Sequence, residues 1–188
     1  MNAPLSLTMT KAEFNLWIGR QATKHEWKEG RVVQMTNVTK AHARIVANLI
    51  RALSRQFDPV EWSVTASDLG VEGDNFIRYP DVIVERMDDD DKGRRARQPI
   101  VLVEVLSVST EATDLVEKLG EYRAFASLEA YVVASQDTPK LWVWQRDAAG
   151  EFATEPALVE GRGAMLGLSA RGISVPLAEL FLGVAAGT

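Results

Sequence analysis

The order of predicted elements places this chain in the α/β or mixed α+β class, with a mixed β-sheet flanked by helices. Two amphipathic segments, residues 39–57 and 114–126, have apolar residues at helical spacing. Between them, residues 100–106 form a continuous apolar run, which is typical of a central strand covered on both faces. The chain shows no internal repeat and no linker, so we expect one domain over residues 1–188.

The composition is that of an ordinary globular protein, with 46% apolar and 25% charged residues among 188. No apolar run is long enough to span a bilayer, and the first residues lack the basic and apolar regions of an export signal. The absence of cysteine excludes disulfides and Cys-bound zinc and fits a cytoplasmic protein. A net charge of −5 argues against a protein that coats nucleic acid, but it does not exclude a nuclease.

The first part of the chain predicts a helix, a hairpin and a second helix. Residues 10–21 begin with Thr10 followed by Glu13, a capping box, and continue with apolar residues at helical spacing. Residues 25–35 predict a β-hairpin that turns at Glu29-Gly30. Residues 39–57 then form the clearest amphipathic helix of the chain.

Strand patterns follow the Asp58-Pro59 break. Residues 61–66 alternate, residues 71–75 predict a turn, and residues 76–85 form one β-branched and aromatic run. Residues 86–98 combine four acids with a lysine and several arginines and predict an exposed loop. Its arginines either remain solvated or approach a phosphate backbone.

The last third of the chain predicts a polar loop, a helix and a hairpin. The loop covers residues 107–113 and the helix residues 114–126, with Lys118 on the side away from the apolar residues. Two strands and a final helical turn are expected at residues 130–134, 141–146 and 177–182. The tryptophans Trp62, Trp142 and Trp144 lie on alternating strands, where they are expected to pack rather than to stack on bases.

Two acids stand within these strand patterns. Asp81 begins one strand run and Glu104 lies inside the apolar strand, where an unpaired carboxylate is costly. If the two strands are neighbours, both acids could hold a divalent cation, with the carbonyl of Val105 as a third, neutral ligand. The alternatives are that Asp81 only forms a turn and that Glu104 pairs with Lys118 or an arginine.

The residues also match a known pattern. The segments P-D-V-I-V, P-I-V-L-V-E-V-L-S-V-S-T, D-L-V-E-K-L-G-E-Y-R and L-E-A-Y-V-V resemble the Uma family of restriction endonucleases, which belongs to the PD-(D/E)XK nuclease superfamily. The resemblance covers nearly the whole chain. It implies a restriction-endonuclease-like core and DNA cleavage that depends on Mg²⁺ or Mn²⁺.

The resemblance also implies site residues. Asp81 and Glu104 match the two motif acids, but the superfamily lysine two residues beyond the second acid is replaced by Leu106. Lys118 matches a lysine that the family carries on the following helix. Such a lysine can reach the same place from the helix, although a single helical lysine is more often solvated.

Four further positions follow from the same resemblance. Glu26 matches the acid of the family's hairpin and would bind the metal from outside or hold a water. His42 matches a family histidine, although a histidine on the edge of an apolar helix is more often a core residue. Ser107 and Ser109 would bind a phosphate or cap the next helix.

Two functions therefore remain open from the sequence. The first is a metal-dependent endonuclease that acts on DNA as a homodimer, with the dimer expected from the resemblance alone. The second is a catalytically silent module that keeps the nuclease fold and binds nucleic acid or a protein partner. A hydrolase with a serine or cysteine nucleophile is not supported, because Gly-x-Ser-x-Gly and cysteine are both absent.

Overall fold

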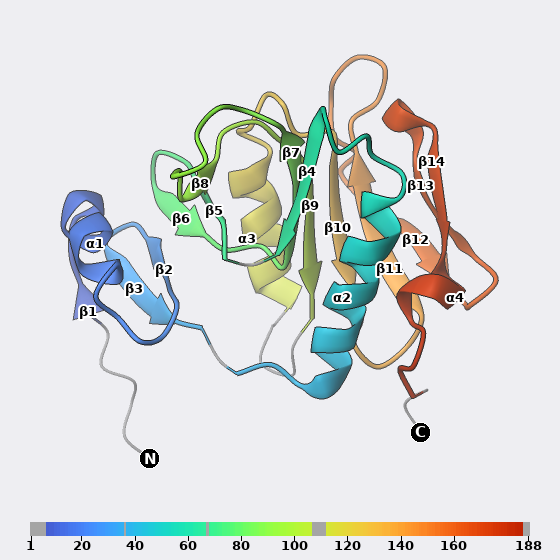
Figure 1. Ribbon diagram of the computed structural model, residues 1–188, viewed down its shortest axis with the longest axis horizontal. Helices are drawn as coiled ribbons and strands as arrows, with labels where there is room; N and C mark the ends of the chain where they lie inside the picture. Colours follow the sequence, from blue (N-terminus) through green and yellow to red (C-terminus); the bar gives the residue numbers. More distant parts are fainter. Residues whose placement is uncertain (1–6, 36, 67, 107–111, 186–188) are drawn as a thin grey trace.

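The computed structural model describes residues 7–35, 37–66, 68–106 and 112–185, with only the backbone described for 112–115. The mixed α+β class expected from the sequence is confirmed, but the strands form two six-stranded sheets rather than one (Figure 1). The larger of the two, here the core sheet, has the spatial order β12 (Ala157–Glu160), β11 (Lys140–Gln145), β10 (Ala130–Ala134), β9 (Pro99–Val105), β7 (Val82–Arg86) and β4 (Trp62–Ala66).

The other six-stranded sheet, here the outer sheet, carries the predicted hairpin. Its spatial order is β1 (Leu7–Thr8), β3 (Arg31–Gln34), β2 (His25–Lys28), β6 (Phe76–Arg78), β5 (Gly70–Glu72) and β8 (Arg95–Ala96). The hairpin turns where expected, because both Glu29 and Gly30 adopt positive φ, at 46° and 88°. A separate two-stranded sheet is made of β13 (Met165–Leu168) and β14 (Ile173–Pro176).

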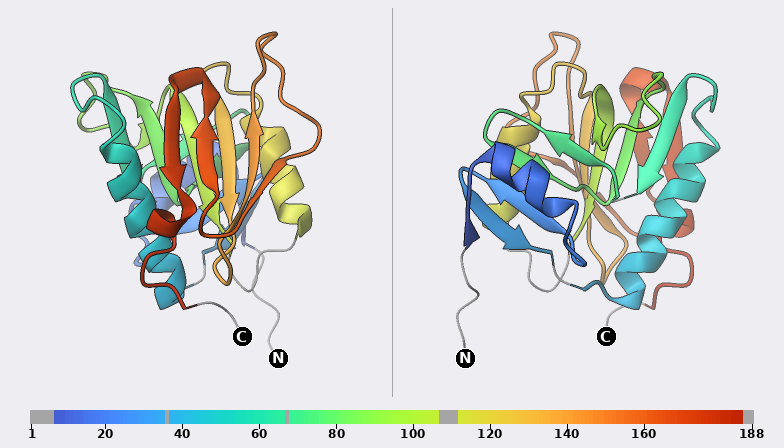
Figure 2. Two further views of the ribbon diagram at one scale, coloured as in Figure 1. Left: turned by 90° about the vertical axis from the view of Figure 1, so that its right-hand side faces the viewer. Right: turned by 60° about the vertical axis from the view of Figure 1, so that its left-hand side comes forward.

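Helices cover both faces of the core sheet. One face packs against α2 (Lys40–Ser54), β13, β14 and α4 (Leu177–Leu180), and the other against α3 (Ala112–Tyr122) (Figure 2). The helix α1 (Lys11–Ile18) packs on the outer sheet, and Thr10 and Glu13 cap it as expected. No helix within the described residues is long and apolar enough to cross a membrane.

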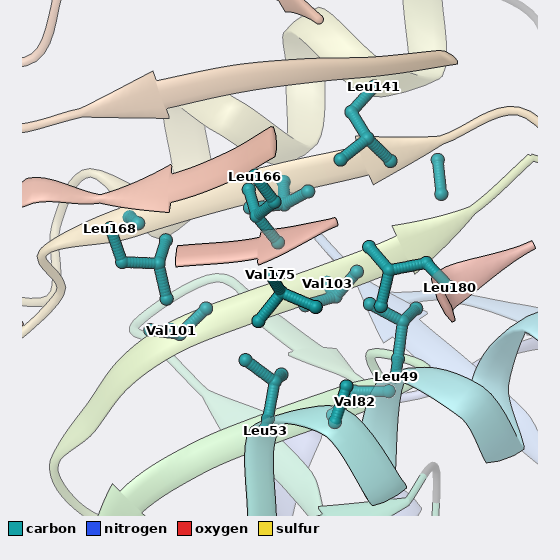
Figure 3. Close-up of a cluster of buried hydrophobic side chains, with 14 of the residues drawn as sticks. Leu49, Leu53, Val82, Val101, Val103, Leu141, Leu166, Leu168, Val175 and Leu180 are labelled. Carbon is teal, nitrogen blue, oxygen red and sulfur yellow. The ribbon is translucent and has the colours of Figure 1, made fainter. Parts of the chain in front are cut away.

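The centre of the core sheet follows the pairing that the apolar run predicts. All seven residues of β9 are buried, β9 pairs in parallel with β10, and it pairs antiparallel with β7. Alternate side chains of β9 enter two different cores: Val101, Val103 and Val105 face α2, while Leu102 and Glu104 face α3. Figure 3 shows the first of these cores, where Leu49 and Leu53 of α2 meet β7, β9 and the β13–β14 sheet.

The run at residues 76–85 is not one strand, which corrects the sequence expectation. Tyr79 and Pro80 separate β6 in the outer sheet from β7 in the core sheet. Proline lacks an N–H for a ladder hydrogen bond, so the chain can leave one sheet there and enter the other. Asp81 stands directly after this break.

Three smaller expectations were also wrong in part. The turn expected at residues 71–75 begins only after β5, and the loop at residues 86–98 contains β8, whose Ala96 is buried. The short strands β5 and β8 pair in parallel within the outer sheet, and nothing in their local composition indicates this pairing. The helix α3 begins at Ala112 and ends at Tyr122, earlier at both ends than predicted.

We expect Leu53→Ala to lower the free energy of unfolding by about 2–5 kcal/mol, because it opens a cavity at a fully buried position between α2 and the core sheet. Leu16→Ala on α1 is the matched control, because that leucine is 75% exposed, and its effect should stay within about 0.5 kcal/mol. Urea unfolding followed by circular dichroism measures both values. Equal losses for the two variants would contradict the packing described here.

Candidate functional site

The buried charged residues of the described chain lie together. They are Glu26 on β2, Arg78 on β6, Asp81 before β7, Glu104 on β9 and Lys118 on α3, each at most 8% exposed. We call these five residues the buried charge cluster. Each is polar enough to be costly in an apolar interior, so their gathering in one place requires that they satisfy one another or a ligand.

Asp81 is held at the edge of the core sheet by two donors. Its Oδ2 accepts a hydrogen bond of 2.8 Å from the backbone N–H of Val105 and one of 3.0 Å from Nε2 of His42. An ionised carboxylate only accepts, so the His42 Nε2 carries the proton. The other ring nitrogen, Nδ1, is buried and has no hydrogen-bond partner in the part of the chain that the structure describes.

Glu104 points from β9 toward α3, where two side chains donate to it. Its Oε1 accepts from Lys118 Nζ at 3.1 Å and from the Tyr122 hydroxyl at 2.9 Å. Lys118 and Tyr122 are four residues apart and therefore lie on one face of α3, one turn from each other. Lys118 is thus buried, and it does not lie on a solvated helix face.

Burial is the largest influence on the pKa values of Glu104 and Tyr122. Loss of hydration raises the pKa of Glu104 to about 7, with Lys118 opposing the shift and the charges of Asp81 and Glu26 adding to it. Burial likewise raises the pKa of Tyr122 well above its ordinary value, so its hydroxyl remains a donor to Glu104. Because the charge of Asp81 raises the pKa of Glu104, the two motif acids are close enough to interact electrostatically.

Arg78 links the outer sheet, including Glu26 on β2, to α3 through Glu121. It donates to Glu26 Oε2 at 2.8 Å and to both carboxylate oxygens of Glu121 at 2.8 and 2.9 Å. Burial alone would disfavour the cation, but the hydrogen bonds and charges of Glu121 and Glu26 outweigh it and raise the pKa of Arg78. Lys118 Nζ lies 3.9 Å from Glu26 Oε1, so Lys118 connects Glu26 to Glu104.

The structure brings most of the predicted site residues into one place. Asp81, Glu104, Lys118 and Glu26 are members of the buried charge cluster, and His42 contacts it through Asp81. The position of the superfamily lysine, Leu106, packs instead against the core on the α3 side.

The remaining predicted residues have a different outcome. Val105 joins the site through its amide, whereas its expected role used the carbonyl. Ser107 and Ser109 lie outside the described residues.

Sequence reasoning missed two residues of this site. Arg78 was read only as part of a strand, although an arginine between Ile77 and Tyr79 in an apolar run is itself a signal that an acid must be close. Tyr122 is four residues from Lys118, and this spacing already places both on the same face of the helix.

No group of three or more His, Asp and Glu side chains in the described residues is arranged to hold a metal ion. Two carboxylates nevertheless keep a free oxygen. Asp81 uses only Oδ2 and Glu104 only Oε1 in hydrogen bonds within the described chain. One or two carboxylates, with water completing the shell, are the usual protein ligands of Mg²⁺, so this donor set fits that ion.

A mixed sheet flanked by helices, with one acid just before β7, a second acid on the neighbouring strand β9 and a lysine beside them, fits a restriction-endonuclease-like nuclease fold. The sequence pattern of the Uma2 family, described as "Putative restriction endonuclease", matches residues 12–178. The chain therefore belongs to the Uma2 family.

Individual proteins are similar to it as well. The chain is 29% identical to "Uncharacterized protein slr1290" of Synechocystis sp. over 77% of each chain. It is 30% identical to "Uncharacterized protein sll1609" of the same organism, over 68% of this chain and 75% of that one. Among solved structures, a "putative nuclease belonging to DUF820" from Anabaena variabilis superposes with a TM-score of 0.74 at 14% identity, covering 95% of this chain and 98% of the other, which shows the shared fold.

The raised pKa of Glu104 predicts a pH dependence of stability in metal-free protein. The folded protein binds a proton at Glu104 up to about pH 7, whereas the unfolded chain releases it near the ordinary value of 4.5. The resulting stabilisation is complete below that lower value and is lost as the pH rises through about 7. Glu104→Gln removes this proton equilibrium, so its melting temperature relative to wild type should increase from about pH 5 to about pH 8. Thermal unfolding in EDTA measures it, and parallel pH curves for the two proteins would contradict the burial of an ionisable Glu104.

Proposed function

We propose that this protein is an endonuclease that hydrolyses DNA phosphodiester bonds with a divalent metal, Mg²⁺ or Mn²⁺. The observation that carries the proposal is the meeting of Asp81, Glu104 and Lys118, from three different elements, at one edge of the core sheet. Membership in the Uma2 family and the nuclease-like fold support it.

Asp81 and Glu104 would hold the metal through the oxygens that no protein donor occupies, and the carbonyl of Val105 would be the third ligand. When bound, the metal supplies Lewis acidity toward the phosphate and lowers the pKa of a bound water. The cation would also offset the excess of negative charge, since three buried carboxylates of the cluster face only two buried cations. The charges of the cluster would therefore favour binding of a cation, and this argument does not depend on family membership.

The remaining residues would prepare the site. Lys118 donates to Glu104 and stands within 3.9 Å of Glu26, so its ammonium can orient the attacking water or accept part of the charge on the phosphate. His42 holds Asp81 in a fixed orientation, which leaves Oδ1 for the cation. Glu26, fixed by Arg78, would bind a water of the metal's outer shell.

We further infer that the chain acts as one nuclease domain in the cytoplasm, and that two copies associate so that both strands of a duplex are cut. These points rest on family membership. The alternative is a silent module of the same fold. Lys118 favours it, because an ammonium already pairs with Glu104 and partly neutralises the cluster without a metal.

Asp81→Asn and Glu104→Gln should each reduce nicking of supercoiled plasmid by at least about 100-fold in Mg²⁺ or Mn²⁺, because each removes a charged ligand while keeping the side chain's shape. The matched controls are Asp89→Asn and Glu155→Gln, which make the same changes at exposed positions. Gel electrophoresis of the plasmid gives the rates. Nicking that persists equally in all five proteins would identify a contaminating nuclease.

Calorimetric titration of the wild-type chain with Mg²⁺ or Mn²⁺ separates the nuclease from the silent module. The nuclease predicts heat of binding and a melting temperature that rises with metal concentration, because the ion binds only the folded chain. Both effects should disappear in Asp81→Asn. A wild-type protein that neither releases heat nor gains stability would favour the module instead.

A further inference from the structure

Three elements meet where the central strands β9 and β10 of the core sheet end. The parallel strands β9 and β10 both finish there, with Val105 opposite Ala134, and the N-terminal end of α2 lies at that edge beside them (Figure 1). The chain leaves β10 through Ser135 and Gln136, and Gln136 is only 4% exposed. A buried amide at the end of a strand needs a reason, because it brings one acceptor and two donors into the protein.

The cap of α2 explains why the side-chain oxygen of Gln136 is buried. Thr39 caps the helix, since its hydroxyl oxygen accepts from the N–H of His42 at 3.1 Å. The hydroxyl proton must then be donated elsewhere, and Gln136 Oε1 accepts it at 2.7 Å. In this orientation the amide oxygen accepts the hydroxyl proton, so the proton of Thr39 and the oxygen of Gln136 are both paired.

The NH₂ group of the same amide has no such explanation. Gln136 Nε2 has no hydrogen-bond acceptor within the described residues. It is not one of the fully buried polar atoms that lack a partner, so the atom keeps some exposure to solvent. It carries two N–H groups and stands at the N-terminal end of a helix of 15 residues. A nearly buried side chain with unused donors at that position is arranged to meet an acceptor that the protein does not provide.

The helix end itself favours a negative partner. The N–H groups of Lys40 and Ala41, at the first two positions of α2, have no intrahelical acceptor and none elsewhere in the described residues. The first turn contains no acid, and the exposed Lys40 places a cation where the helix dipole is already positive. An anion at this position would compensate both charges.

A short chain of hydrogen bonds connects this position to the candidate site. Gln136 bonds to Thr39, Thr39 caps His42, and His42 donates to Asp81. An anion held by Gln136 and α2 would therefore be connected through Thr39 and His42 to the acid that would bind the metal.

We propose that Gln136 Nε2 and the N-terminal end of α2 bind a backbone phosphate of the DNA substrate beside the Asp81–Glu104 site, an inference that rests on the proposed nuclease function. Gln136 is then a substrate-binding residue. It contributes neutral hydrogen bonds, while Lys40 contributes charge to the same phosphate. Contacts of this kind fix the position of the duplex and carry no base specificity.

The test uses full-length protein carrying Glu104→Gln, so that a short fluorescein-labelled duplex stays intact, with Mg²⁺ present. Adding Gln136→Glu keeps the acceptor for Thr39 but replaces the free donors with negative charge. We expect the Kd from fluorescence anisotropy to rise at least about tenfold, because a carboxylate faces the phosphate. The melting temperature should stay level or rise, because a carboxylate at a helix N-terminus is stabilising. A purely structural Gln136 would not combine these two results.

Two further variants complete the experiment. Gln56→Glu adds the same charge near the other end of α2, at an exposed position, and should leave the Kd within about twofold. Lys40→Gln should lower the slope of log Kd against log salt by about one, as expected when one phosphate contact loses its cation.

The outcomes are decisive for the phosphate site. It is overturned if Gln136→Glu and Gln56→Glu bind equally, or if the Glu104→Gln protein does not bind the duplex at all. Failure of the proposed nuclease function would instead appear as a wild-type protein that does not nick plasmid, which this binding assay does not depend on.

Discussion

The arrangement of this protein depends on the burial of Glu104 within an otherwise apolar central strand. A carboxylate there cannot keep its hydration, and Lys118 and Tyr122 of α3 replace it. Because the helix must approach β9 closely enough for these contacts, one ionic requirement fixes the position of α3 on the sheet. Arg78 then extends the same network to Glu26 and so attaches the outer sheet to the same helix. Fold and candidate site thus share their central interactions.

Much of the fold could be predicted from the sequence, because its signals are local. The periodicity of α2, the capping box of α1, the Glu29-Gly30 turn and the apolar run of β9 each require only neighbouring residues. The second sheet could not be predicted, because pairings such as β5 with β8 join short segments that have no distinctive pattern alone. For the same reason, the break at Pro80 was hidden in an unbroken β-branched run.

The candidate site divides in a similar way. Asp81 and Glu104 could be found because acids in apolar strands are exceptions to the composition around them. The role of Lys118 was suggested by resemblance only, since its burial depends on how α3 lies on the sheet. Arg78 and Gln136 were missed because their importance comes from partners distant in the sequence, Glu121 for the arginine and Thr39 for the glutamine. Sequence shows which groups are costly to bury, and the tertiary structure shows what compensates them.

The placement of the lysine on α3, and not on β9, has a consequence for how the protein matures. With Leu106 in the strand position, neighbouring strands that have already paired still lack an ammonium group. The cluster is completed only when a helix encoded further along the chain docks. Pairing of β9 with β7 alone therefore leaves Glu104 without its ammonium partner, and the cluster is complete only in a molecule in which α3 has docked on the sheet.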